Sequence, residues 1–237
     1  MTLNNLGIAY SLDGNFDEAA DHLSVAVSYR ETIYKADLSV QHRADFARTI
    51  SSLGVALDQM GRHAEAIDRF KQALEHQEEI YRAHPTVNSR MDLATTIQHL
   101  TIALNNTCHY GEAIDCGKQA HEHWTALYQK EPSPRGKLRL GASYTNLGIS
   151  CYHLGHYREA LEYYRQVIEL FKGLHESHPS VRSRADLAGS LNNLGTTLNN
   201  MGRYAEATAG NNVVQASMRV QIAHGWPSLG EWIWQLI

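Results

Sequence analysis

The sequence has little cysteine and little proline, and each shortage excludes a class of protein. Three cysteines, Cys108, Cys116 and Cys151, have spacings that match no metal site or redox motif, and they indicate a reducing compartment. Five prolines and 43% hydrophobic residues are typical of a folded helical protein and exclude a disordered chain. We therefore predict a folded protein that holds no metal and no cofactor.

Long apolar runs and basic clusters are also missing. No apolar run approaches the length of a membrane span and no signal peptide opens the chain, so we expect a cytoplasmic protein. The 237 residues carry a formal net charge of -4 without a basic run. A nucleic acid or an anionic membrane is therefore not an expected partner.

The sequence does contain a repeat with a fixed period of 47 residues. The fourth residue of a five-residue pattern is leucine in all five copies: Leu6, Leu53, Leu100, Leu147 and Leu194. A period of this size indicates a repeat array in which each unit packs against its neighbours. We predict an all-α fold, an α-α superhelix of helix-turn-helix units. The expected units are about 1–36, 43–83, 90–130, 137–177 and 184–223.

Each unit begins with a helical pattern around the leucine. In the first unit Leu3, Leu6, Gly7 and Tyr10 fall at i, i+3, i+4 and i+7, which is one face of an α-helix. Glycine follows the leucine in four of the five units, and Thr101 replaces it in the third. Glycine weakens a helix interior by about 0.5–1 kcal/mol. Its return therefore predicts that another backbone passes too close there for a side chain.

Glycines also mark the predicted C-terminal end of each first helix. They are Gly14, Gly61, Gly155 and Gly202, with Cys108 in their place in the third unit. A second helix of about 20 residues follows and opens with an acidic residue and an alanine, as in Glu18-Ala19. Its end is marked by prolines that recur at the same period: Pro85, Pro132 and Pro179.

The start of the next first helix is expected shortly after each proline. The predicted starts are Arg43, Arg90 and Arg184. Ser89 and Ser183 are the predicted N-caps, because an acidic residue follows each of them three positions later.

These slots resemble the tetratricopeptide repeat pattern W-x2-L-G-x2-Y…A-x3-F. The matching residues are Leu3, Leu6, Gly7, Tyr10, Ala19 and Leu23, and then Ala66 with Phe70 and Ala160 with Tyr164. The resemblance covers residues 1–209 in five copies, with a period of 47 residues in place of the usual 34. Such long units, with Asn-Asn-Leu-Gly and His-Pro-Ser/Thr-Val segments, are similar to kinesin light chain repeats and to bacterial arrays fused to serine/threonine protein kinases.

The resemblance implies a scaffold that binds other proteins and whose first helices line the inner curve of the superhelix. On these helices the face turned away from the leucines carries amides and hydroxyls beside β-branched side chains. Amides offer both a donor and an acceptor, which suits an extended peptide backbone. The predicted groove residues are Asn4, Ile8, Arg48, Ser51, Val55, Asp58, Gln98, Ile102, Asn105, Thr145, Ile149, Tyr152, Asn192, Thr196 and Asn199. The alternative is that these side chains only solvate an exposed helix.

The sequence offers little support for functions other than a peptide-binding scaffold. The candidate metal-binding pairs are His121/His123, His153/His156 and His175/His178, and none supplies three or four ligands at an accepted spacing. The segment 42–45 is similar to a kinase catalytic loop, but no Gly-rich phosphate loop accompanies it. We therefore expect no enzyme. The alternatives are a structural or regulatory arm of a larger protein, such as a signalling kinase, and an enzyme with unrecognised chemistry.

Both ends depart from the repeat. Only Met1 to Asn5 precede Leu6, so we expect a piece of a longer array, with incomplete terminal repeats through which it could self-associate. Near the other end a helical stripe follows Pro227, formed by Leu229, Trp232, Ile233, Leu236 and Ile237. We predict that residues 224–237 form a helix that caps the fifth unit, the alternative being a disordered tail.

Overall fold

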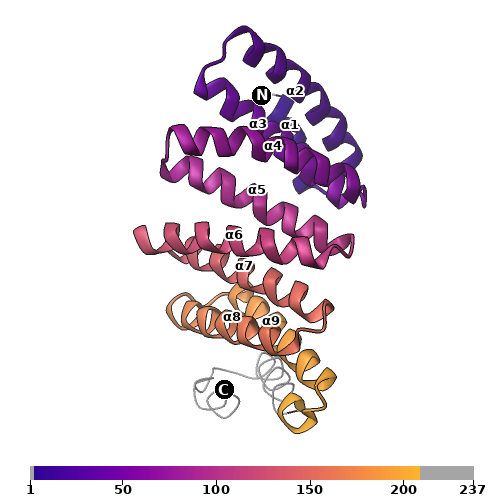
Figure 1. Ribbon diagram of the computed structural model, residues 1–237, viewed down its shortest axis with the longest axis vertical. Coiled ribbons are helices and arrows are strands. Elements are labelled where there is room, and N and C mark those ends of the chain that lie inside the picture. The colour runs from indigo at the N-terminus through magenta and orange to yellow at the C-terminus, as the bar shows by residue number, and fades with distance from the viewer. Residues whose placement is uncertain (1–2, 209–237) are drawn as a thin grey trace. The chain divides into compact units, whose positions relative to one another are not determined.

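The computed structural model describes residues 3–208, and the regular secondary structure in that range is all α-helical. The helices run in pairs joined by short turns (Figure 1). In chain order they are α1 (Leu3–Leu12), α2 (Phe16–Ala36), α3 (Val40–Gln59), α4 (His63–Ala83), α5 (Val87–Asn106), α6 (Tyr110–Lys130), α7 (Pro134–His153), α8 (Tyr157–Ser177) and α9 (Val181–Asn200). The predicted all-α repeat fold is confirmed.

Two compact units divide the chain after Leu127. In the first unit α1 to α5 pack in succession, and in the second unit α7 packs on α8 and α8 on α9. None of the helices in residues 3–208 is long and apolar enough to cross a membrane. The division into five repeats stays a prediction, and the proposed cap at 224–237 lies outside the described residues.

A residue with positive φ closes the turn within each hairpin. The glycines of this slot, Gly14, Gly61, Gly155 and Gly202, have φ between 74 and 81°. The next amide then donates to a carbonyl near the end of the helix, as from Arg62 N to Leu57 O across 2.9 Å. The predicted helix ends are therefore confirmed. Cys108 fills the slot in the third hairpin with φ of 61°, where a side chain is strained.

The first helices begin three residues earlier than predicted. Their N-caps are Ser39, Thr86, Ser133 and Ser180, whose side chains accept a hydrogen bond from the backbone N–H at N3. Ser89 and Ser183 are therefore not N-caps, and the predicted starts at Arg43, Arg90 and Arg184 are wrong. Both serines sit at N3 and complete capping boxes, with Ser89 N donating to Thr86 Oγ1 across 3.0 Å. The cap falls directly after the proline because the backbone there is already extended, which is the conformation an N-cap needs.

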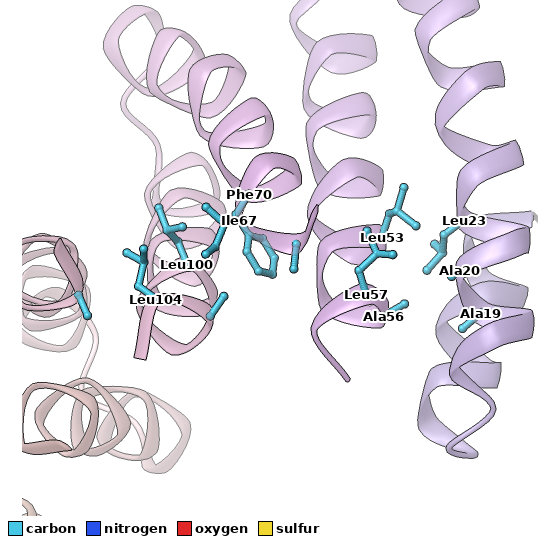
Figure 2. Packing of buried hydrophobic residues seen from close by; sticks show 13 residues of the cluster. Ala19, Ala20, Leu23, Leu53, Ala56, Leu57, Ile67, Phe70, Leu100 and Leu104 are labelled. Atoms are coloured by element: carbon cyan, nitrogen blue, oxygen red, sulfur yellow. The ribbon is translucent and has the colours of Figure 1, made fainter. Parts of the chain in front are cut away.

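The core of the first unit joins successive hairpins. It is a cluster of buried alanines, leucines, Ile67 and Phe70 from α2, α3, α4, α5 and the start of α6 (Figure 2). The repeating leucine lies inside it, since Leu53 and Leu100 are each 4% exposed. A hairpin therefore buries its apolar faces largely against its neighbours, as expected of a repeat array.

The prediction that another backbone passes close to the mid-helix glycines is wrong for Gly54 and Gly148, because the neighbouring group at each of them is an aromatic side chain. A Cβ on Gly54 would lie 2.7 Å from the Phe70 ring, and one on Gly148 would lie 2.5 Å from the Tyr164 ring. In the third hairpin the sizes are exchanged: the glycine slot holds Thr101, and the slot of the large side chain holds Gly117. Both are buried. Within a hairpin, a small residue in the glycine slot of one helix is thus paired with a large side chain of the other helix, and a larger residue in that slot is paired with a glycine.

Candidate functional site

A hollow of about 490 Å³ lies in the first unit against α1, α3 and α5. Five of the predicted groove residues line it: Asn4, Ile8, Arg48, Ser51 and Val55. Its floor includes a hydrogen bond of 3.0 Å between the hydroxyls of Ser51 and Thr96, which links α3 to α5. Three successive first helices therefore form one polar surface in this unit.

A second hollow of about 260 Å³ adjoins the first at the N-terminal ends of α3 and α5. The two hollows share three lining residues, Arg48, Gln77 and Asp92. We call the two hollows together the α3–α5 groove. Within it, Val40, Ala44 and Ile80 give the second hollow an apolar wall beside these polar groups.

Asp45 anchors the positive charges of the groove. Its carboxylate accepts hydrogen bonds from Arg30 Nη1 of α2 across 3.2 Å and from Gln41 Nε2 across 3.0 Å. Arg48 also donates to it, from one turn further along α3. Both arginines of the groove are therefore held by the same carboxylate.

Asp92 has a different environment. It is half-buried, and its carboxylate makes no hydrogen bond or ion pair with any residue in the range 3–208. Burial raises the pKa of Asp92, an effect that Arg48 opposes and Asp45 reinforces. The groove thus contains one carboxylate whose loss of hydration is not compensated by a partner.

Unpaired amides lie in and beside the groove. Gln77 reaches it from α4 and is 3% exposed, and its buried Oε1 has no hydrogen-bond partner. Asn4 Oδ1 is a second buried acceptor without a partner on the lining of the larger hollow. The predicted Gln98 is 6% exposed with an unpartnered Oε1, but it does not line either hollow. Buried amide oxygens without a partner are uncommon, and each could accept a hydrogen bond from a ligand.

The remaining predicted residues of the first unit lie outside the two hollows. Asp58 is 9% exposed, and its carboxylate is in contact with His63 Nδ1 at 2.6 Å and accepts from Asn106 Nδ2 at 3.3 Å. It therefore ties α3 to α4 and α5. Ile102 and Asn105 are half-buried on α5.

The second unit holds the other six predicted residues. Thr145, Ile149 and Tyr152 are half-buried on α7, whereas Asn192, Thr196 and Asn199 are exposed on α9. The Tyr152 hydroxyl accepts a hydrogen bond of 2.6 Å from Asn200, in the same slots that Asp58 and Asn106 occupy two repeats earlier. Their role in a groove stays a prediction.

Other lining residues of the larger hollow were not predicted, and they include the charged and buried polar groups Arg30, Asp45, Gln77 and Asp92. A signal for two of them is present in the sequence, because Arg30 and Gln77 occupy a slot that holds Trp124 and Phe171 in later repeats. Those two aromatic residues are buried. A polar residue in a slot that is otherwise buried and aromatic marks a place where the core opens.

Among the described residues no group of three or more His, Cys, Asp and Glu side chains is placed to hold a metal ion.

Two tetratricopeptide repeat profiles match the chain. One covers residues 1–37, 46–86 and 187–209, and the other covers 141–173. No curated protein sequence is significantly similar to the chain.

Solved structures share the fold at low sequence identity. BtubC (BKLC) from P. vanneervenii has a TM-score of 0.73 and 19% identity, over 95% of this chain and 82% of its own. A putative kinesin light chain with nearly identical TPR-like repeats from Podosopora anserina has a TM-score of 0.69 and 20% identity, over 94% and 96%. The Rap conjugation gene regulator of plasmid pLS20, in complex with the Phr* peptide, has a TM-score of 0.59 and 18% identity, over 92% of this chain and 53% of its own. By its profile matches and its paired helices, the chain belongs to the tetratricopeptide repeat family.

Proposed function

We propose that this protein is a non-enzymatic scaffold that binds an extended peptide segment of a partner protein in the α3–α5 groove. The tetratricopeptide repeat fold is generally a protein-interaction scaffold and is typically non-catalytic. The observation that carries the finer proposal is the 490 Å³ hollow, in which three successive first helices present polar side chains side by side.

The chemistry of the groove suits a peptide backbone. An extended backbone presents amide donors and carbonyl acceptors along its length, and the side-chain amides of Asn4 and Gln77 can match either. Ile8 and Val55 add apolar surface between the polar groups. A net hydrogen bond contributes roughly 0.5–1.5 kcal/mol, so several of them supply the roughly 8 kcal/mol of micromolar binding.

A structural relative also supports a peptide ligand. The Rap regulator of plasmid pLS20, which shares the fold, is a complex with the Phr* peptide. Because the identity is 18%, the likeness concerns the fold and does not carry over any binding residue. The proposal for this chain rests on its own groove.

The test is a selection from a bead-displayed library of random decapeptides, followed by affinity measurements on the enriched peptides. Ser52→Arg places a long side chain at the lining of the larger hollow without changing the buried core. We expect it to weaken binding at least tenfold. Gln59→Arg is the matched control, because it adds the same charge to an exposed position of α3 outside both hollows.

Circular dichroism of both variants establishes that the helices are intact. If the enriched peptides bind Ser52→Arg as tightly as the wild-type protein, the groove is not the binding site. If the wild-type protein enriches no peptide, peptide binding itself is wrong for this chain.

A further inference from the structure

We propose that the point where the two hollows meet is a recognition pocket for a positively charged side chain, lysine or arginine, of the bound peptide. This inference rests on the proposed function and gives the groove a sequence preference. The pocket is lined by the three residues that both hollows share, Arg48, Gln77 and Asp92, with the apolar wall of Val40 and Ile80 beside them. Arg48 is paired with Asp45, so Asp92 and Gln77 are the groups that a ligand can contact.

The charges of the groove are not evenly paired. Arg30 and Arg48 both form an ion pair with Asp45, so two cations share one carboxylate. Asp92 lines both hollows and has no cation within ion-pair distance among the described residues. A cation brought in by a ligand would give Asp92 the partner that the chain itself does not supply.

Gln77 is the independent observation that points to a ligand at the same place. It lines both hollows and is only 3% exposed, and no residue in the described range donates a hydrogen bond to its Oε1. A buried amide that lacks a partner costs about 1–3 kcal/mol. This oxygen is a hydrogen-bond acceptor, so an incoming ammonium or guanidinium group can donate to it.

The neighbouring groups favour a cation over other side chains. An acidic side chain would add a like charge next to Asp92, and an apolar one would bury that carboxylate further without a partner. Lysine and arginine place an aliphatic stem before the charge. The stem has an apolar surface to lie on, because Val40, Ala44 and Ile80 line the second hollow.

The first test compares peptide selections from the bead-displayed decapeptide library with three proteins. We expect the wild-type protein to enrich lysine or arginine at one fixed position. Asp92→Asn should still enrich peptides but without a basic residue at that position. Asp68→Asn is the matched control, because Asp68 is an exposed aspartate of α4 that lines neither hollow, and it should retain the preference.

The outcomes separate this inference from the proposed function. Enriched peptides that are blocked by Ser52→Arg but show no fixed basic position overturn the pocket and leave the peptide groove standing. Peptides that Ser52→Arg does not affect overturn both. A basic preference that persists unchanged in Asp92→Asn places the cation elsewhere and also overturns the pocket.

The second test measures the charge itself. An enriched lysine peptide is compared with the same peptide carrying norleucine, which keeps the stem and removes the ammonium group. The wild-type protein should bind the norleucine peptide about ten- to hundredfold more weakly, the value of a hydrogen bond between charged groups. Asp92→Asn should bind the two peptides equally, and an equal loss in both proteins would contradict the assignment.

The variant Gln77→Met tests whether Gln77 contacts the cation or has only a structural role, because only a contact would change the affinity for the lysine peptide alone. Methionine has a similar length without polar atoms, so the fold should remain intact and the unfolding midpoint should not fall. We expect affinity for the lysine peptide to decrease severalfold while affinity for the norleucine peptide is unchanged. A loss of the same size for both peptides would show that Gln77 does not contact the cation.

Discussion

The side-chain amide of Asn106 donates a hydrogen bond to the carboxylate of Asp58 across 3.3 Å and joins the C-terminal ends of α5 and α3. His63, near the start of α4, contacts the same carboxylate at 2.6 Å. Asp58 was predicted to line a groove, yet its carboxylate contacts two other helices of its own array, α4 and α5. One side chain thus fixes the spacing between two hairpins.

Asp58→Ala should therefore destabilise the protein without changing peptide binding through the α3–α5 groove. The change removes the contacts of this carboxylate with His63 and Asn106, and each hydrogen bond contributes roughly 0.5–1.5 kcal/mol. Urea unfolding followed by circular dichroism measures the loss. Asn106→Ala, which removes a single hydrogen bond, should cost less, and equal losses in the two variants would contradict the three-helix role of Asp58.

The exchanged sizes of Thr101 and Gly117 in the third hairpin predict that substitutions at these two positions have coupled effects on stability. Gly117→Phe alone should destabilise by about 1–3 kcal/mol, because Thr101 already fills the slot opposite. Thr101→Gly should relieve part of that cost and restore the arrangement of Gly54 with Phe70. Unfolding of the two single variants and the double variant gives the interaction energy. Strictly additive losses would mean that the two slots do not face each other.

Cys108 predicts a stabilising substitution. Its φ of 61° is strained for a residue with a side chain, and the equivalent turns use glycine. Cys108→Gly should raise the free energy of unfolding by roughly 0.5–1 kcal/mol, since relief of strain outweighs the greater freedom of glycine in the unfolded chain. Thermal unfolding measures the change. The matched substitution Gly155→Ala, at φ of 78°, should shift the melting temperature in the opposite direction.

Asp92 predicts a pH-dependent stability. Burial raises its pKa in the folded state, so the stability it contributes is present below the pKa of an unfolded aspartate, about 3.9, and is lost as the pH rises through the raised value. Asp92→Asn should consequently raise the urea midpoint at pH 7 and have no effect near pH 3. Arg48, Asp45 and His99 line the same hollow, so the difference between the two proteins is the readout. A lower midpoint for Asp92→Asn at pH 7 would show that the carboxylate is stabilised by a partner.

Much of the fold could be predicted because its signals are local and repeat. Gly61 and Gly155 mark helix ends by a backbone conformation that depends on few neighbours, and Leu53 and Leu147 mark the buried face by their spacing. The starts of α5 and α9 were misplaced because two residues with side-chain hydroxyls compete for each cap. Thr86 and Ser89 both have cap-forming hydroxyls, and the choice between them depends on where the chain leaves the proline.

The site was predicted only in part, because its composition depends on tertiary contacts. The first-helix face gave Asn4, Ser51 and Val55, but Gln77 enters from a second helix. Arg48 contacts Asp45 and leaves Asp92 without a cation. This choice depends on side-chain conformation, which the spacing of residues in the sequence does not reveal.

The matched sizes within a hairpin restrict how such an array can change. An exchange of chain between repeats that begins in the middle of a hairpin would bring Thr101 opposite a ring such as that of Phe70, or leave Gly54 opposite Gly117. The first combination overfills the core and the second leaves a void. An exchange at Ser133 or Ser180, where a helix start is capped locally, moves both halves of a hairpin together. Recombination and design can therefore duplicate, delete or permute this array in whole hairpins, with the proline links as the points of division.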